Sequence, residues 1–202
     1  MKPLIVAATR FEIAPSIPLL EELDIPYLIT GVGMTATAYA LGKALALSPA
    51  YAEVINVGIA GSFCRELPLG AVVTITQDTF YELGAEDDDN VLSIEELGFG
   101  KGTYFSSSSK DLYLPSYAAI TVNRVHGNDR SIALCQAKYP HVAIESMEGA
   151  AVFYACTQEQ LPCIQVRAIS NYVERRDKST WKIDLAITNL NNWLQKFIRE
   201  NY

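Results

Sequence analysis

Apolar residues follow two alternating patterns along the chain. Short continuous apolar runs are typical of buried strands, and segments in which apolar residues recur every three or four positions are typical of helices. The runs predict strands over 4–9, 27–30, 54–57, 70–76, 118–125, 142–144 and 163–169. The periodic segments predict helices over 13–23, 34–47, 129–138 and 180–198, and another that begins at Met147. This alternation indicates an α/β domain with three layers and a central mixed sheet, one domain over 1–202.

Two polar stretches show neither pattern. The acidic run at 86–89 has no periodicity, and we interpret it as a solvated loop in preference to a metal site. The serines at 106–109 also indicate a loop, whose polarity would suit a lid. The sequence leaves the role of the acidic run open.

Composition indicates a folded protein of the cytoplasm. Half of the 202 residues are hydrophobic, 19% are charged, and the net charge is -7. An acidic chain without a Lys/Arg cluster lacks the surface that nucleic-acid binding requires. No apolar run approaches the roughly 20 residues of a membrane span, and the first residues do not have the pattern of a signal peptide. We therefore expect neither a nucleic-acid partner nor a membrane partner.

The four cysteines are interpreted as small buried thiols. Cys64, Cys135, Cys156 and Cys163 have no CxxC spacing and lie among apolar residues. This context favours free thiols over zinc ligands or disulfides. We expect neither a metal nor a cofactor.

Glycines and polar residues gather where the predicted strands end. Glu12 follows the first strand, 31–33 the second, 58–61 the third, and 170–171 the last. In α/β folds the loops at strand ends form the ligand crevice. None of these glycines matches a Walker motif, and 31–33 lacks the third glycine of a dinucleotide fingerprint. Close packing explains the glycines as well as ligand contact does.

The two histidines do not form a recognisable catalytic motif. His126 ends a predicted strand and His141 lies in a predicted surface turn, without HExxH spacing. A structural role for His126 is favoured over a catalytic one.

Two carboxylates and an amide remain as candidate chemistry: Glu12, Glu148 and Asn171. A pair of carboxylates suits cleavage of a glycosidic bond, because one can act as general base on water while the other binds the sugar and stabilises positive charge. Each residue also has an ordinary explanation, since acids favour the first turn of a helix and asparagine favours turns. Only the three together favour the catalytic interpretation.

Five blocks in this order resemble the nucleoside phosphorylase/nucleosidase superfamily, in the branch of methylthioadenosine/S-adenosylhomocysteine nucleosidase. They are 8–12 (ATRFE), 31–33 (GVG), 56–61 (NVGIAG), 147–151 (MEGAA) and 167–171 (RAISN). Within that branch the segment RAISNYVERRDKS is most similar to the futalosine hydrolase family. The resemblance implies a nucleoside phosphorylase-like fold.

The resemblance also implies roles for individual residues. Glu12 would activate the attacking water, and Asn171 would take the place of the aspartate that activates the purine leaving group. Glu148 would bind the ribose 2′ and 3′ hydroxyls. The substrate-binding positions implied in this way are Ala60, Gly61, Met147, Glu148, Arg167 (near the water) and Ser170.

Two departures from the superfamily pattern favour hydrolysis of a 6-oxopurine nucleoside. An amide at Asn171 can donate to a 6-oxo group and accept from N7–H, which matches hypoxanthine better than adenine. Phosphorylases of the superfamily hold phosphate with an arginine and a serine where this chain has Asn56 and Ile59, and neither of these supplies charge. The implied reaction is hydrolysis of futalosine to hypoxanthine and dehypoxanthine futalosine, in menaquinone biosynthesis. An adenine-releasing nucleosidase and a non-catalytic nucleoside-binding module are the alternatives.

Three features stay open at this stage. Futalosine carries a carboxylate on an arm beyond its 5′ carbon, and Arg175 or Arg176 could pair with it, or both could be solvated. In relatives a second subunit completes the 5′ pocket, which implies a homodimer or a larger assembly. The residue that stacks on the base lies within 122–128 but is not identified.

Overall fold

The computed structural model describes residues 1–47, 51–88, 90–108, 110 and 112–202. Its strands are β1 (Leu4–Ala7), β2 (Tyr27–Ile29), β3 (Val54–Ser62), β4 (Val72–Phe80), β5 (Gly84–Asp87), β6 (Asn90–Ser93), β7 (Thr103–Phe105), β8 (Ser116–Thr121), β9 (Val142–Ser146) and β10 (Cys163–Tyr172). Its α-helices are α1 (Arg10–Ile13), α2 (Ile17–Glu22), α3 (Met34–Leu47), α4 (Asp129–Lys138), α5 (Gly149–Gln158) and α6 (Ile183–Asn201). Short 3-10 turns, η1 (Ala14–Ser16) and η2 (Lys178–Thr180), precede α2 and α6.

A mixed sheet forms the centre of the fold, as predicted. β2, β1, β3 and β10 run parallel to one another in this order, and β4 pairs antiparallel with β10. β8 and β9 continue the sheet in parallel with β4, while β7 pairs antiparallel with β4. The end of β3 then pairs antiparallel with β9, so β3, β10, β4, β8 and β9 close on themselves.

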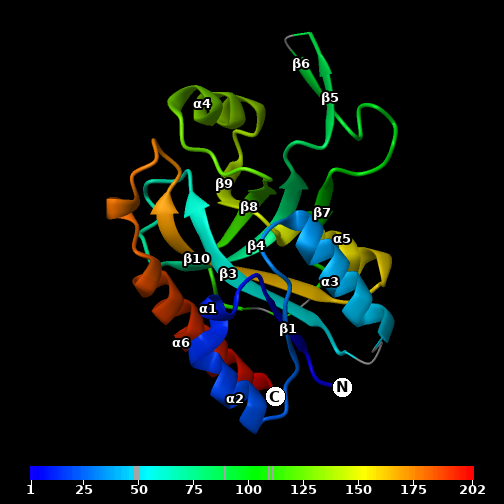
Figure 1. Ribbon diagram of the computed structural model, residues 1–202, viewed down its shortest axis with the longest axis vertical. Coiled ribbons are helices and arrows are strands. Elements are labelled where there is room, and N and C mark those ends of the chain that lie inside the picture. The colour runs from blue at the N-terminus through cyan, green and yellow to red at the C-terminus, as the bar shows by residue number, and fades with distance from the viewer. Residues whose placement is uncertain (48–50, 89, 109, 111) are drawn as a thin grey trace.

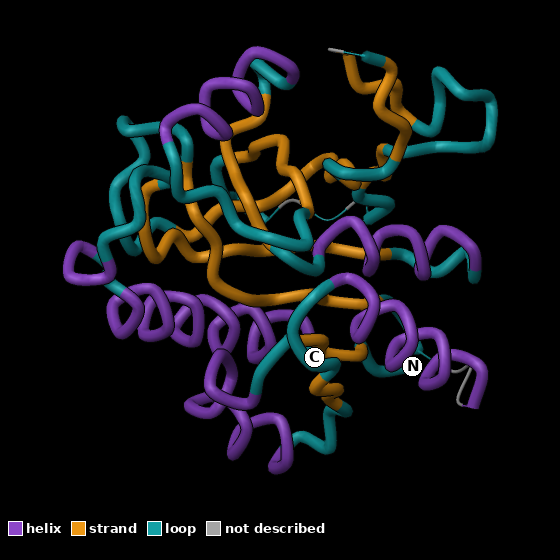
Figure 2. The backbone as a smooth tube through the Cα atoms, turned by 45° about the horizontal axis from the view of Figure 1, so that its top comes forward, coloured by secondary structure: helices purple, strands orange, loops and turns teal. Residues whose placement is uncertain are grey.

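Two helical layers cover the sheet (Figures 1 and 2). In β1, Ile5 and Ala7 belong to the hydrophobic cluster with α1, α2 and α6, whereas Leu4 and Val6 belong to the cluster with α3 and α5. This alternation follows from the two-residue period of a strand. Burial of each larger side chain contributes about 1.5–3 kcal/mol.

Several predicted boundaries were wrong for identifiable reasons. The helix expected over 13–23 is divided among α1, η1 and α2, because Pro15 and Pro18 lack the backbone N–H of a continuous helix. The strand expected to end at residue 57 continues to Ser62, since β10 and β9 supply partners beyond Gly58. Two other boundaries lie inside the predicted ranges. The strand expected over 118–125 ends at Thr121, and the last helix, expected to begin at residue 180, begins at Ile183.

The region of the acidic run is a hairpin. β5 and β6 pair antiparallel, with Glu86 opposite Val91, and they project from the top of the molecule in Figure 1. The loop interpretation was therefore wrong for Glu86 and Asp87, while Asp89 lies outside the described residues. Among the described residues there is no cluster of metal-ligating side chains. Ser109 also lies outside the described residues, and the backbone N–H of Ser107 donates to Cys163 O at 3.2 Å.

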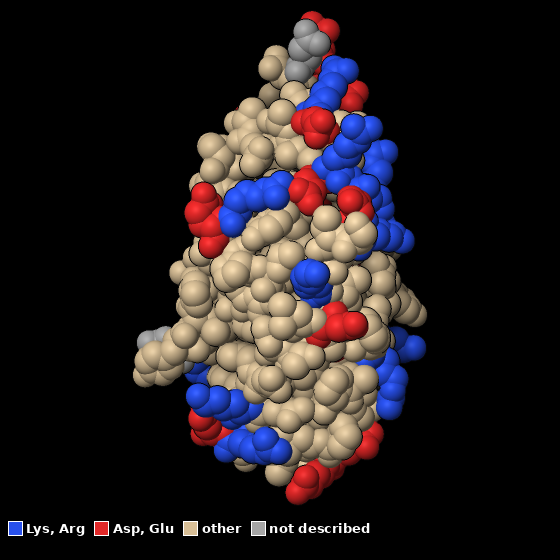
Figure 3. Space-filling model, turned by 90° about the vertical axis from the view of Figure 1, so that its left-hand side faces the viewer, with Lys and Arg blue, Asp and Glu red and all other residues tan. Residues whose placement is uncertain are grey.

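The charged surface and the cysteines can be compared with the expectations drawn from composition. On the face shown in Figure 3, basic and acidic side chains lie intermixed. No helix in the described part of the chain is long and apolar enough to cross a membrane. Cys135, Cys156 and Cys163 are buried, as predicted, whereas Cys64 is half-buried.

Candidate active site

Glu12 is held at the point where β1 passes into α1. Thr9 is the N-cap of α1, and both its N–H and its hydroxyl donate to Glu12 Oε2, at 2.9 and 3.0 Å. The other oxygen, Oε1, accepts from the backbone N–H of Ile59 at 3.1 Å. A Cβ at position 58 would lie 2.8 Å from that oxygen, so Gly58 is required for the approach. Glu12 is thereby a buried acceptor with a fixed direction.

Glu148 is the N-cap of α5 and not a first-turn residue as one alternative supposed. Its Oε1 accepts from the N–H of Gly33 at 2.8 Å. Gly33 has φ +95°, a conformation that favours glycine, and it turns this N–H toward the carboxylate. Burial raises the pKa of Glu148 above its ordinary value, while the bond from Gly33 and the charge of Arg167 lower it.

Asn171 lies at a bulge near the end of β10. Ile169 pairs with Ala60 and Asn171 pairs with Gly61, so Ser170 is the extra residue. The Ser170 hydroxyl donates to Asn171 Oδ1 at 2.8 Å, and Asn171 Nδ2 donates to Tyr172 O at 2.9 Å. These two bonds fix the amide plane and leave one lone pair on Oδ1 and one N–H on Nδ2 available.

One cavity of about 410 Å³ brings the predicted residues together. This volume lies in the range of small-molecule sites. Its polar lining includes Glu12, Glu148 and Asn171. The cavity is also lined by Thr9, Phe11, Ile59, Ala60, Gly61, Val125, Glu145, Met147, Ser170, Arg176 and Trp181. Arg167 is the single predicted site residue outside this lining.

Comparison with known proteins assigns the family. No family model matches the chain. It is 32% identical over 174 residues to the futalosine hydrolase of Acidothermus cellulolyticus, an alignment that covers 81% of this chain and 70% of that protein. The chain belongs to the futalosine hydrolase family. It is also 31% identical over 152 residues to the futalosine hydrolase of Streptomyces coelicolor, covering 72% of this chain and 65%, just under two thirds, of that protein.

Solved structures of related proteins share the fold of this chain. The structure of futalosine hydrolase from Helicobacter pylori superposes with a TM-score of 0.83 at 17% identity, covering 99% of this chain and 98% of that one. The predicted nucleoside phosphorylase-like fold is confirmed. The predicted class of enzyme, an N-glycosidic hydrolase, is the class that the relatives' names denote.

Arg167 lies beneath the cavity of this family member. It is 2% exposed, and its Nη2 donates to Asn56 Oδ1 at 2.5 Å. A Cβ at position 58 would lie 3.6 Å from Nη1 and 2.8 Å from Glu12 Oε1, so the guanidinium and the Glu12 carboxylate both lie close to Gly58. Burial lowers the pKa of Arg167, opposed by the charges of Glu148, Asp78 and Glu12. The guanidinium compensates the carboxylates from inside the sheet.

Asp78 is a buried carboxyl group that the sequence patterns do not predict. It is 0% exposed and accepts from Thr121 Oγ1 at 2.8 Å and from Gln165 Nε2 at 3.1 Å. Thr121 in turn accepts from the N–H of Ala150 at 2.8 Å, so Asp78 is linked to the first turn of α5. Burial raises the pKa of Asp78 to about 6, although the bonds from Thr121 and Gln165 lower it.

The raised pKa of Asp78 predicts a pH-dependent stability. The folded protein binds the proton of the Asp78 carboxyl group more tightly than the unfolded chain does. Ionised Asp78 therefore lowers the free energy of unfolding, most strongly above pH 6, and this destabilisation is relieved as the pH falls toward 4. A pKa raised from 3.8 to about 6 corresponds to a destabilisation of roughly 3 kcal/mol at most. Asp78→Asn should raise the melting temperature at pH 7.5, by about 2–4 °C for each kcal/mol recovered.

Thermal melts at pH 7.5 and pH 5 check this prediction. The advantage of Asp78→Asn over the unmodified protein should shrink at pH 5, where Asp78 is protonated. Asp87→Asn, at an exposed position of β5, is the control and should change neither value. A variant that is less stable at pH 7.5 would show that ionised Asp78 stabilises α5.

The structure also adds lining residues that the sequence patterns did not single out. In the segment 122–128, Val125 lines the cavity, and His126 lines a smaller recess next to it. Arg176 lines the cavity with its guanidinium 5.1 Å from the Trp181 ring, whereas Arg175 lines neither space. Trp181 lies outside the five blocks, and Phe11 lies in the first block but had no implied role, so their place in the cavity depended on the tertiary fold.

Proposed function

We propose that this protein hydrolyses the N-glycosidic bond of futalosine and releases hypoxanthine and dehypoxanthine futalosine, as a step in menaquinone biosynthesis. Membership of the futalosine hydrolase family supports this function. The observation that carries it is the meeting of Glu12, Glu148 and Asn171 in one cavity of nucleoside size.

Glu12 is the proposed general base. Three hydrogen bonds hold its carboxylate, and it faces the cavity. Glu12 takes a proton from water while the water oxygen bonds to C1′ of the ribose. The bond from C1′ to N9 breaks, and its electron pair leaves with the purine. A general base of this kind contributes roughly 100- to 10,000-fold in rate.

Glu148 and Asn171 are proposed to act on the two products of bond cleavage. Glu148 accepts hydrogen bonds from the ribose 2′ and 3′ hydroxyls, and its charge stabilises the oxocarbenium-like ring. Asn171 Nδ2 donates to O6 of hypoxanthine, and Oδ1 accepts from N7–H once solvent has protonated N7. Met147, Ala60 and Gly61 enclose the sugar and the base.

Water is favoured over phosphate as the nucleophile. Asn56 is 2% exposed, and its amide is engaged by Val6 O at 3.0 Å and by Arg167. Ile59 presents only a backbone N–H, which Glu12 occupies. These two positions therefore supply neither charge nor a free donor for a phosphate dianion.

We further propose that a second subunit completes the 5′ end of the site. A larger cavity of about 780 Å³ begins at Met34, one residue after the glycine that holds Glu148, and is lined by Ala38, Tyr104 and Tyr154. Phe99 lines it too and is 79% exposed, as an interface residue would be in an isolated chain. A solution mass of twice 22.2 kDa is the expected measurement. The cytoplasmic location and the pairing of Arg176 with the arm carboxylate stay predictions.

A base-release assay tests the proposed function. Futalosine and inosine are incubated with the protein, with and without phosphate, and free hypoxanthine is measured. We expect release from futalosine without phosphate. Release from inosine only with phosphate would indicate a phosphorylase. Faster release of adenine from methylthioadenosine, adenosylhomocysteine or aminodeoxyfutalosine would favour the adenine-releasing alternative, and no release from any nucleoside would favour a binding module.

A further inference from the structure

A buried pair of titratable side chains, Glu145 and His126, has no part in the mechanism above. Glu145 is 3% exposed. The backbone N–H of His126 donates to both its oxygens, at 3.1 Å to Oε1 and 3.3 Å to Oε2, and the ring Nδ1 of His126 also contacts Oε2. The imidazole packs edge-on against Tyr81 and Phe63, with ring centroids 5.0 and 6.2 Å apart. The carboxylate is thus fixed on one side.

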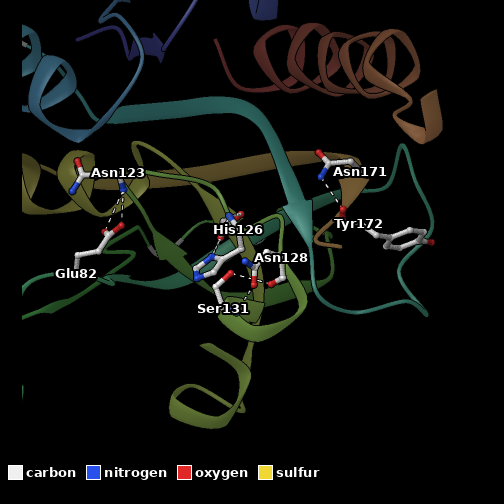
Figure 4. Close-up of polar contacts among 8 residues, drawn as sticks. Glu82, Asn123, His126, Asn128, Ser131, Asn171 and Tyr172 are labelled. Atoms are coloured by element: carbon white, nitrogen blue, oxygen red, sulfur yellow. Dashed lines mark hydrogen bonds and ion pairs between the residues drawn. The ribbon is translucent and has the colours of Figure 1, made fainter. Parts of the chain in front are cut away.

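The other side of Glu145 faces the site. Asn171 of β10 pairs with Gly61 of β3, and Gly61 pairs with Glu145 of β9. Directly paired residues project to the same face of a sheet, so Asn171 and Glu145 stand on either side of Gly61, two strand spacings or roughly 10 Å apart. Figure 4 shows the end of β3 passing between His126 and Asn171. All three residues of this row line the 410 Å³ cavity.

Gly61 keeps the space within this row open. A Cβ there would lie 2.9 Å from Val173 Cγ2 and 3.2 Å from Asn171 Nδ2. Every other residue would therefore crowd the amide that is proposed to bind the base. Between Asn171 and Glu145 the structure leaves a slot with an amide on one side and a carboxylate on the other.

We propose that Glu145, positioned by His126, accepts the N1–H of the base and makes the site selective for 6-oxopurines. This inference rests on the proposed function. Asn171 is proposed to bind N7 and O6 of hypoxanthine. The next polar group around the ring is N1–H, which is a donor. Adenine has a bare N1, an acceptor, and would set its lone pair against a carboxylate that can only accept. Such a mismatch leaves buried polar groups unpaired.

The carboxylate has capacity for this additional bond. Its two oxygens offer about four acceptor positions, and the backbone and ring of His126 occupy three of them. The other charged groups that line the adjacent recess have partners elsewhere. Glu174 pairs with Arg65 at 2.5 Å, and Arg176 lies over Trp181.

Binding of free bases tests the inference without requiring turnover. The dissociation constants of hypoxanthine and adenine are measured by calorimetry for the unmodified protein, Glu145→Gln and the control Glu174→Gln. The amide introduced by Glu145→Gln can donate to N1 of adenine, so this variant should lower the preference for hypoxanthine over adenine by about 10-fold or more. Glu174→Gln should leave the preference unchanged. Equal weakening of both bases, as expected of a structural role, would overturn the proposal.

A second measurement uses the unmodified protein alone, in case the variant does not fold. 1-Methylhypoxanthine lacks the N1–H, and it should bind at least about 10-fold more weakly than hypoxanthine. Equal binding of the two would overturn the role of Glu145. If futalosine is still hydrolysed in that case, the proposed function stands and only this inference fails.

Discussion

Glu12→Gln should lower the turnover number for futalosine by about 1,000-fold, within the range of a lost general base. The amide keeps the shape of the carboxylate, and its oxygen can still accept from Thr9 or from Ile59. It cannot take a proton from water. The Michaelis constant should change little, because Glu148 and Asn171 still bind the sugar and the base.

Single-turnover assays with measured futalosine binding separate these effects. Glu21→Gln, at an exposed carboxylate on α2, is the matched control and should behave as the unmodified protein. Turnover within a few-fold of normal in Glu12→Gln would remove Glu12 from the role of base. Loss of binding together with turnover would indicate that it contacts the ground-state substrate.

Asn171→Asp should shift the specificity toward 6-amino bases. A protonated aspartate can donate to N7 and accept from the 6-amino group, whereas a 6-oxo group would face an acceptor. The ratio of kcat/KM for futalosine to that for aminodeoxyfutalosine should fall by roughly 10- to 100-fold, the effect of one mismatched buried hydrogen bond. Because Glu145 is proposed to select against adenine independently, this single change should not reverse the preference completely.

Paired assays on the two nucleosides measure this shift. Asn90→Asp, at an exposed position of the β5–β6 hairpin, introduces the same chemical change away from the cavity and should leave the ratio unaltered. An unaltered ratio in Asn171→Asp as well would mean that residue 171 does not contact the six-position of the base.

The fold was largely predictable because local pattern and tertiary position agree in its core. The apolar runs at β1, β3 and β10 are buried as expected, and the strand ends carry Glu12 and Asn171. The Glu148 carboxylate lies at the start of α5, as the 147–151 block indicated, and it accepts from the N–H of Gly33, a contact that the sequence did not predict. Motif spacing therefore located the residues that lie beside strand ends or helix starts.

Residues whose environment depends on distant partners could not be located in this way. Glu145 belongs to none of the five sequence blocks, and His126 was interpreted as a structural residue. Their pairing depends on how the 122–128 loop packs over β9. Asp78 lies inside a strand whose polar residues gave no reason to expect a fully buried carboxyl group. The pairing of β9 with β3, which closes the sheet, could not be predicted either. It involves only two residue pairs, too few to produce a recognisable pattern in the sequence.

The double use of one edge of β3 has a consequence for folding. β1 occupies the first part of that edge and β9 the last part, while β10 covers the other edge. Pieces of the site therefore arrive from residues 12, 61, 145 and 171, and the carbonyl of Glu12 is bonded by Asn191, 179 positions away. Contacts at such separations form slowly, because the intervening chain must first lose its freedom. The cavity is therefore complete only once these distant segments have met, and no segment of the chain forms it alone.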